Sequence, residues 1–234
     1  MGRVVNSDEF TEICTALRNE GAENINLVTP SHMAPTLVSY LKKVRKAGVM
    51  LPVAWNSSGF ESSETVKMAS EIVDIWLPDL KTLDDAAARR IYGIKKYPES
   101  AAAAILQMAD FGNAEIDDEG RMIRGLMVRH LILPGELEST RGVLAWFAEN
   151  LKERAWLSLM SQYTPVHIPG ETRNVPERQL SESEYQRVLG WLEEFSIDDG
   201  FVQDLVPGED WLPDFRRINP FSSDLSRIIW NGAI

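Results

Sequence analysis

The alternation of apolar runs with helical segments constrains the fold more than any other feature of the sequence. Five short apolar runs are predicted to be buried strands, and each is followed by a polar loop and then by a segment with helical spacing. These runs are residues 25–28, 51–55, 72–77, 122–133 and 156–160. Repeated units of this kind predict an α/β fold with a parallel sheet, right-handed crossovers and helices on at least one face.

The predicted helices begin at recognisable N-terminal signals. Ser7 is predicted to cap the first helix, and Ser181 with Glu184 forms a capping box for the last one. The predicted helical ranges are 7–21, 36–46, 63–70, 84–91, 98–111, 140–151 and 181–195. Because periodicity fades beyond Asp198, we expect one domain over residues 1–197 and a C-terminal tail over 198–234 packed on it.

The charge balance argues against nucleic acid as a partner. The 234 residues include 35 acidic and 24 basic side chains, and the net charge of −11 opposes a phosphate backbone. The sequence has no apolar stretch of about 18 residues, and its first residues lack the apolar core of a signal peptide. We therefore expect a cytoplasmic protein with no membrane association.

Cysteine and histidine are too few and too dispersed to predict a metal site. The single cysteine, Cys14, excludes a disulfide framework and a zinc site built on cysteine pairs. Its neighbours Phe10, Ile13 and Leu17, at helical spacing, favour a small buried hydrophobe over a nucleophile. The three histidines lack the close spacing of metal ligands, so we expect no metal-binding residues in this chain.

Polar residues lie at or near the carboxyl end of each of the five predicted strands. The segments are residues 29–32, 56–59, 78–81, 129–130 and 160–163. Carboxyl ends of parallel strands share one edge of the sheet, where closed and open α/β folds both bind ligands. The sequence therefore predicts a polar small-molecule site at this edge.

Three of four polar residues at this edge allow more than one interpretation. Asp79 and Lys81 point to the same side and form either a structural ion pair or a ligand-binding pair, whereas a buried neutral Lys81 would suit a Schiff base. Arg129 lies in an apolar run and requires a partner. Because alternate strand residues face opposite sides, His130 faces away from Arg129, and it is either a core histidine hydrogen-bonded to the backbone or a catalytic residue.

Five stretches carry a resemblance to a known family: residues 24–32, 56–62, 73–81, 128–135 and 160–163, which include Asp79-Leu80-Lys81 and Arg129-His130. In order and spacing they resemble radical S-adenosylmethionine (SAM) proteins of the pyruvate formate-lyase activating enzyme type, over residues 7–165. The resemblance implies a partial, open TIM-type barrel with a [4Fe-4S] cluster on three cysteines. It also implies reductive SAM cleavage to a 5′-deoxyadenosyl radical that abstracts hydrogen from a protein substrate bearing a glycyl radical site.

The resemblance assigns ten residues to the wall that faces SAM and the substrate. In chain order they are Thr29, Ser31, Asn56, Ser58, Asp79, Lys81, Arg129, His130, Gln162 and Tyr163. The first two stand near the methionine amino group of SAM, the next two face its carboxylate and ribose, and Asp79 and Lys81 also stand on the SAM side. The last four correspond to contacts with the substrate or adenine.

The N-terminal part of the chain departs from the family pattern. The first barrel strand and the cysteine loop are missing, and Cys14 cannot replace three thiolates. The predicted strand at 25–28 is then an exposed edge. We expect the SAM-binding portion of a truncated radical SAM protein, inactive unless an N-terminal fragment supplies the cysteine loop. The alternatives are a non-catalytic binding module on the same barrel and a Schiff-base lyase using Lys81.

Overall fold

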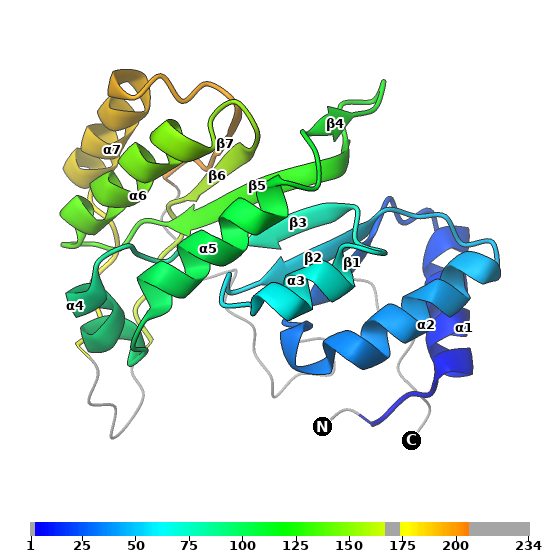
Figure 1. Ribbon diagram of the computed structural model, residues 1–234. Coiled ribbons are helices and arrows are strands. Elements are labelled where there is room, and N and C mark those ends of the chain that lie inside the picture. Colours follow the sequence, from blue (N-terminus) through cyan, green and yellow to red (C-terminus); the bar gives the residue numbers. More distant parts are fainter. Residues whose placement is uncertain (1–2, 167–173, 206–234) are drawn as a thin grey trace.

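The computed structural model describes residues 3–166 and 174–205, shown in Figure 1. A parallel sheet with the strand order β1-β2-β3-β5-β6-β7 lies at its centre, and β4 pairs with β5 in the antiparallel sense. The strands are β1 Ile25–Val28, β2 Val53–Ser57, β3 Ile75–Pro78, β4 Glu115–Ile116, β5 Met122–Leu131, β6 Trp156–Met160 and β7 Gly200–Val202. The parallel strands are neighbours in chain order, as the repeat predicted, and the sheet forms the open partial barrel that the resemblance implies.

Helices connect the strands and lie across one face of the sheet. They are α1 Ser7–Asn19, α2 Ala34–Lys46, α3 Ser63–Ala69, α4 Asp85–Ala87, α5 Tyr97–Ala109, α6 Leu137–Asn150 and α7 Glu182–Glu194, with a 3-10 turn η1 at Ser31–Met33 and a π turn η2 at Ala88–Tyr92. Figure 1 shows α2, α3, α5 and α6 on the same side of the strands. Within the described ranges, no helix combines the length and the apolar character that crossing a bilayer requires.

Strand residues that face these helices form the main core. Trp55, Trp76 and Val128 are at most 2% exposed, and they belong to one apolar cluster with Ile105 of α5 and Phe147 of α6. Side chains alternate between the two faces of a strand, so the residues directly before and after these face the other side. Because the helix-facing residues are buried, their neighbours along each strand line the opposite, concave face of the sheet.

Local capping sets the ends of the first and last helices. Asn6, and not the predicted Ser7, caps α1: its Oδ1 accepts hydrogen bonds from the backbone N–H of Asp8 and Glu9, and Glu9 accepts one from Asn6 N–H. This reciprocal pair is a capping box with asparagine in place of serine. At α7, Ser181 and its partner three residues later form the predicted capping box.

β1 is an edge of the described sheet. It pairs with β2 from Ile25↔Val53 to Val28↔Asn56 and has no strand on its other side within the described residues. The side chain of Val28 is 67% exposed, which is unusual for a valine in a parallel sheet. The outward backbone groups of β1 are therefore open to another strand.

β7 is an addition to the predicted fold. Residues 198–205 were expected to begin a tail, whereas Gly200–Val202 pair in parallel with β6 and extend the sheet. Gly200 makes this pairing feasible, because a Cβ at this position would collide with the carbonyl oxygen of Leu157. The remainder of the expected tail, residues 206–234, lies outside the described residues.

Candidate functional site

Four of the predicted site residues meet at the carboxyl ends of β2, β3 and β5. Arg129 Nη2 lies 2.7 Å from Asp79 Oδ1 and donates a 2.6 Å hydrogen bond to Asn56 Oδ1, while Lys81 Nζ lies 3.1 Å from Asp79 Oδ2. We call Asn56, Asp79, Lys81 and Arg129 the polar cluster. Strand register produces it: Asp79 stands directly opposite Arg129, and Asn56 pairs with Leu77 two residues before Asp79.

The polar cluster is partly buried and carries a net positive charge. The side chains of Asp79 and Arg129 are 23% and 24% exposed, and two cations face one carboxylate. Arg129 Nε is buried without a hydrogen-bond partner. Asp79 Oδ1 also lacks a well-directed hydrogen bond although Arg129 Nη2 is close, so this contact is an ion pair with poor donor geometry. Unused donors beside a positive charge suit an anionic ligand group.

A cavity of about 280 Å³ opens beside the polar cluster. Asp79, Lys81 and Arg129 form its polar end, and its other walls include Ile91, Tyr92, Leu131, Leu133, Met160 and Tyr163. Burial raises the pKa of the Tyr92 hydroxyl far above its usual range, so this residue is neutral at physiological pH. One charged end and apolar walls are typical of a small-molecule site.

A larger hollow of about 620 Å³ lies at the opposite ends of the strands. It is bounded by residues near the amino ends, such as Asn24, Pro52 and Arg121, and by Leu77 and Phe201 on the concave face. Parallel α/β folds bind their ligands at the carboxyl ends. We therefore assign the candidate site to the smaller cavity, where the polar cluster lies.

His130 lies on the helix side of β5, away from this cavity. It is 2% exposed, its Nδ1 lies 2.7 Å from the Leu80 carbonyl oxygen, and its Nε2 lies 3.0 Å from Thr140 Oγ1. Burial lowers the pKa of His130 to about 4, so the ring is neutral. Because it neighbours Arg129 in an extended strand, it must face the other way. His130 is thus the backbone-bonded core histidine of the two predicted alternatives.

The loops after β1 and β2 add a buried carboxylate that the sequence analysis did not single out. Ser31 Oγ donates a 2.6 Å hydrogen bond to Glu61 Oε1. Glu61 is 6% exposed, and its Oε2 is buried with no hydrogen-bond partner. The predicted residues Thr29 and Ser58 are both exposed in these loops. An acidic residue in a loop gives no sequence signal that it will be buried and half satisfied.

The two residues predicted after β6 are divided between the cavity and the chain end. Tyr163 lines the cavity, and its hydroxyl donates a 2.7 Å hydrogen bond to the Pro176 carbonyl oxygen. Gln162 instead accepts a 2.9 Å hydrogen bond from Gln203 Nε2, just beyond β7, and does not line the cavity. The carboxyl ends of β6 and β7 are joined by this contact.

The residues of this chain do not fit the iron-sulfur cluster that the resemblance implies. Cys14 is 1% exposed and packs with Ile25, Val44 and Val49. Burial raises the pKa of its thiol to about 11, which disfavours the thiolate that iron binds. In the described ranges, no three histidine, cysteine, aspartate or glutamate side chains gather as metal ligands.

Comparisons with known proteins support the architecture. No protein-family model matches the chain. An uncharacterized protein of Methanocaldococcus jannaschii is 25% identical over 182 residues, which are 77% of this chain, and the chain spans about half (49%) of the length of that relative.

Two solved structures show which fold this is. A domain of pyruvate-formate lyase-activating enzyme from Bacteroides vulgatus matches with a TM-score of 0.51 and 16% identity, over 77% of this chain and 99% of that domain. SuiB of Streptococcus suis, solved with its precursor peptide SuiA, matches with a TM-score of 0.58 and 10% identity, over 86% of this chain and 43% of SuiB. At these identities the likeness shows the fold alone, and that fold is radical SAM-like.

Proposed function

From a radical SAM-like fold as premise, we propose that this chain forms the SAM-binding and substrate-side wall of a protein resembling pyruvate formate-lyase activating enzyme. The observation that carries the proposal is the polar cluster: Arg129 reaches Asn56 and Asp79 at the carboxyl edge, with its Nε buried and unused beside a cavity. The sheet edge, the charge and the cavity all suit a ligand with a carboxylate, hydroxyl groups and a flat base.

The residues present suit the separate parts of SAM. Lys81 and Arg129 offer donors to its carboxylate, and Asp79 offers acceptors to its ribose hydroxyls. The free Glu61 Oε2, next to Ser31, offers a carboxylate for its amino group, which would relieve the cost of burying an unpaired oxygen. The apolar walls of the cavity suit the adenine ring. When bound, SAM supplies the adenosyl and sulfonium groups on which the family's chemistry depends.

We assign the cluster cysteines to a segment outside this chain, because Cys14 is the one cysteine in its sequence. Cys14 is unsuited as a ligand, and the open edge of β1 offers a place for one more strand carrying a C-x3-C-x2-C loop. The M. jannaschii relative, about twice as long as the matched region, supports a longer functional unit. The expected substrate is a protein bearing a glycyl radical site.

Calorimetry with SAM tests the proposal directly. We expect wild-type chain to bind SAM with a micromolar dissociation constant, and Asp79→Asn to weaken binding by about tenfold or more, which corresponds to about 1.4 kcal/mol. Asp110→Asn is the matched control, because Asp110 is exposed and pairs with Arg154 away from the cavity. Equal affinities for these two variants, or no heat with wild type at millimolar SAM, would sink the proposal.

A non-catalytic binding module is the second candidate, favoured by the unsuitability of Cys14 for a cluster. Co-expression with a segment carrying the three cysteines separates the two functions. Assembly of a cluster and SAM cleavage by the pair would support the enzyme. SAM binding with no cleavage by the pair, after verified iron and sulfide loading, would support the module.

A further inference from the structure

We propose that Tyr97 and His130 are positioning residues, which lock the backbone of Asp79-Leu80-Lys81 so that the two charged side chains stay aimed at the cavity. We call these three residues the β3 turn. Neither Tyr97 nor His130 lines the cavity, so both act through the turn. Their effect on ligand binding rests on the proposed function, whereas their effect on the turn does not.

The Tyr97 hydroxyl joins the β3 turn to the loop after β2. It lies 2.8 Å from the Asp79 carbonyl oxygen and 2.9 Å from that of Ser58, and it accepts a 3.0 Å hydrogen bond from Lys81 N–H. Its single proton can be donated to only one of the two carbonyls at a time, whereas its oxygen accepts the hydrogen bond from Lys81 N–H in either case. The side chain is 0% exposed, and burial raises the pKa of this hydroxyl far above its usual range, so the proton is retained.

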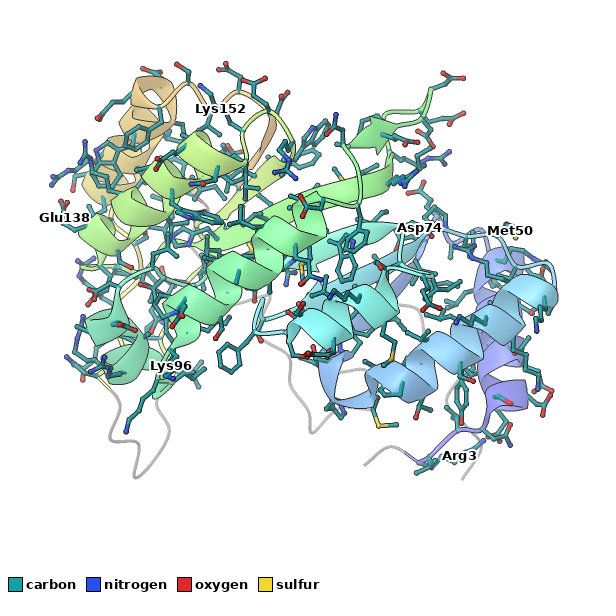
Figure 2. All side chains as sticks on the ribbon, in the orientation of Figure 1. Arg3, Met50, Asp74, Lys96, Glu138 and Lys152 are labelled. Carbon is teal, nitrogen blue, oxygen red and sulfur yellow. The ribbon has the colours of Figure 1, made fainter. Side chains whose placement is uncertain are left out.

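Tyr97 is held in place by the start of α5. Figure 2 labels Lys96, which directly precedes Tyr97 at the N-terminal end of α5. Lys96 has a left-handed backbone conformation (φ 62°), and this bend directs the first residue of the helix toward the strand ends. The ring also stacks on Phe60, with 5.8 Å between centroids. The hydroxyl therefore reaches the turn from a fixed ring.

His130 holds the middle of the β3 turn from the helix side. The Leu80 carbonyl can only accept, so His130 Nδ1 must carry the proton in this 2.7 Å contact. Nε2 is then the acceptor for the Thr140 hydroxyl at 3.0 Å. This second contact fixes the tautomer that the first one needs.

Together these contacts satisfy the backbone of the β3 turn from both sides. Asp79 N–H donates to Ser57 O at 2.9 Å, and Leu80 N–H donates to Arg129 O at 2.8 Å. The side chains of Tyr97 and His130 serve the Asp79 carbonyl, the Leu80 carbonyl and the Lys81 N–H. Side chains thus supply partners for three of these five backbone groups, where a regular sheet would supply strand neighbours. A turn locked in this way presents Asp79 and Lys81 already ordered for binding.

Two amide substitutions of His130 separate positioning from mere packing. His130→Asn places an amide N–H near the position of Nδ1, whereas His130→Gln places it near Nε2. Glutamine is one methylene larger than asparagine, so packing alone would favour His130→Gln over His130→Asn. We expect His130→Asn to keep slow hydrogen exchange at Leu80 and Lys81, measured by NMR on the full chain. His130→Gln and Tyr97→Phe should accelerate exchange of Lys81 N–H by tenfold or more beyond any change in global stability.

SAM affinity should follow the exchange data. We expect the dissociation constant to rise about tenfold in His130→Gln and Tyr97→Phe and to stay within about twofold of wild type in His130→Asn. Tyr40→Phe is the matched control, because its hydroxyl makes only a 3.5 Å contact with Val5 O, far from the turn.

Three outcomes would overturn the inference. They are identical exchange and affinity in His130→Asn and His130→Gln, unchanged exchange of Lys81 in Tyr97→Phe, and a loosened turn with unchanged affinity. If the wild-type chain binds no SAM, the proposed function fails, and exchange at Leu80 and Lys81 alone then decides whether these two residues position the turn.

Discussion

Arg129 in β5 donates a 2.6 Å hydrogen bond to Asn56 in β2, although β3 lies between these strands and 73 residues separate the two in sequence. The contact is feasible because β3 ends at Pro78, so the arginine passes over the strand end beside Asp79. One guanidinium thus joins the ends of three strands.

Replacing Arg129 should weaken both the fold and the site. Arg129→Met leaves Asp79 with Lys81 alone and removes the bond to Asn56, and we expect a loss of about 1–3 kcal/mol in the free energy of unfolding because the pair is partly buried. SAM affinity should fall by tenfold or more. Urea unfolding and calorimetry measure these effects.

Arg124→Met on the same strand is the control. Arg124 is exposed and lies 3.6 Å from Glu115, so its loss should change stability by no more than about 0.5 kcal/mol. A stability loss of equal size in both variants would contradict the importance assigned to the Arg129 contacts.

Gly59 should not tolerate alanine. Its φ is 73°, and an added Cβ would lie 2.6 Å from the Asp79 carbonyl oxygen, so the β3 turn would have to shift. Gly48 has a similar φ of 81° with open space around it. We expect Gly48→Ala to cost about 1 kcal/mol from backbone strain and Gly59→Ala about 2–4 kcal/mol, with weaker SAM binding in the latter alone. Equal costs would show that the turn yields to the methyl group.

Stability should depend on the neutral state of His130. Its pKa in the folded chain is lowered from 6.5 to about 4, so between these values the unfolded chain binds a proton that the folded chain does not. This contribution is complete above pH 6.5 and is lost as the pH falls toward 4. Urea unfolding of wild type should show a steeper decline in this window than His130→Asn, by up to about 1.4 kcal/mol per pH unit. Equal slopes in wild type and His130→Asn would contradict this account.

Cys14 should be inert in the folded chain. Its thiol pKa of about 11 and its burial predict negligible reaction with a disulfide reagent at pH 8, and one reactive thiol per chain after unfolding. Because the folded pKa is raised from 9.0, the stabilising contribution is complete below pH 9 and is lost as the pH rises through 11. Comparison with Cys14→Ala isolates this slope. Rapid labelling of native protein would contradict the assignment.

The polar cluster could be predicted from sequence because each member lies at or near the carboxyl end of an apolar run. Parallel strands bring such ends together, so Asn56, Asp79 and Arg129 could be grouped without knowing the sheet register. Which of these side chains contact one another depends on the sheet register, which places Asp79 opposite Arg129.

Tyr97 and Glu61 could not be predicted in the same way. Tyr97 begins a helix, and nothing in its local sequence shows that its hydroxyl will meet carbonyls 18 and 39 residues away. Glu61 lies in a polar loop, where burial is decided by tertiary packing. For β7, the short run Gly200–Val202 is exposed and lacks the apolar pattern that identified the other strands.

The polar cluster carries a net positive charge, whereas the whole chain carries a net charge of −11. At long range such a chain attracts a molecule like SAM, whose sulfonium and ammonium outweigh its carboxylate. Within about 8 Å, the screening length at physiological salt, the local field at Lys81 and Arg129 has the opposite sign and selects the carboxylate end. Under the proposed function, the chain would attract SAM through the ligand's cationic groups and then orient its carboxylate toward Lys81 and Arg129, so added salt should slow capture while leaving the final orientation unchanged.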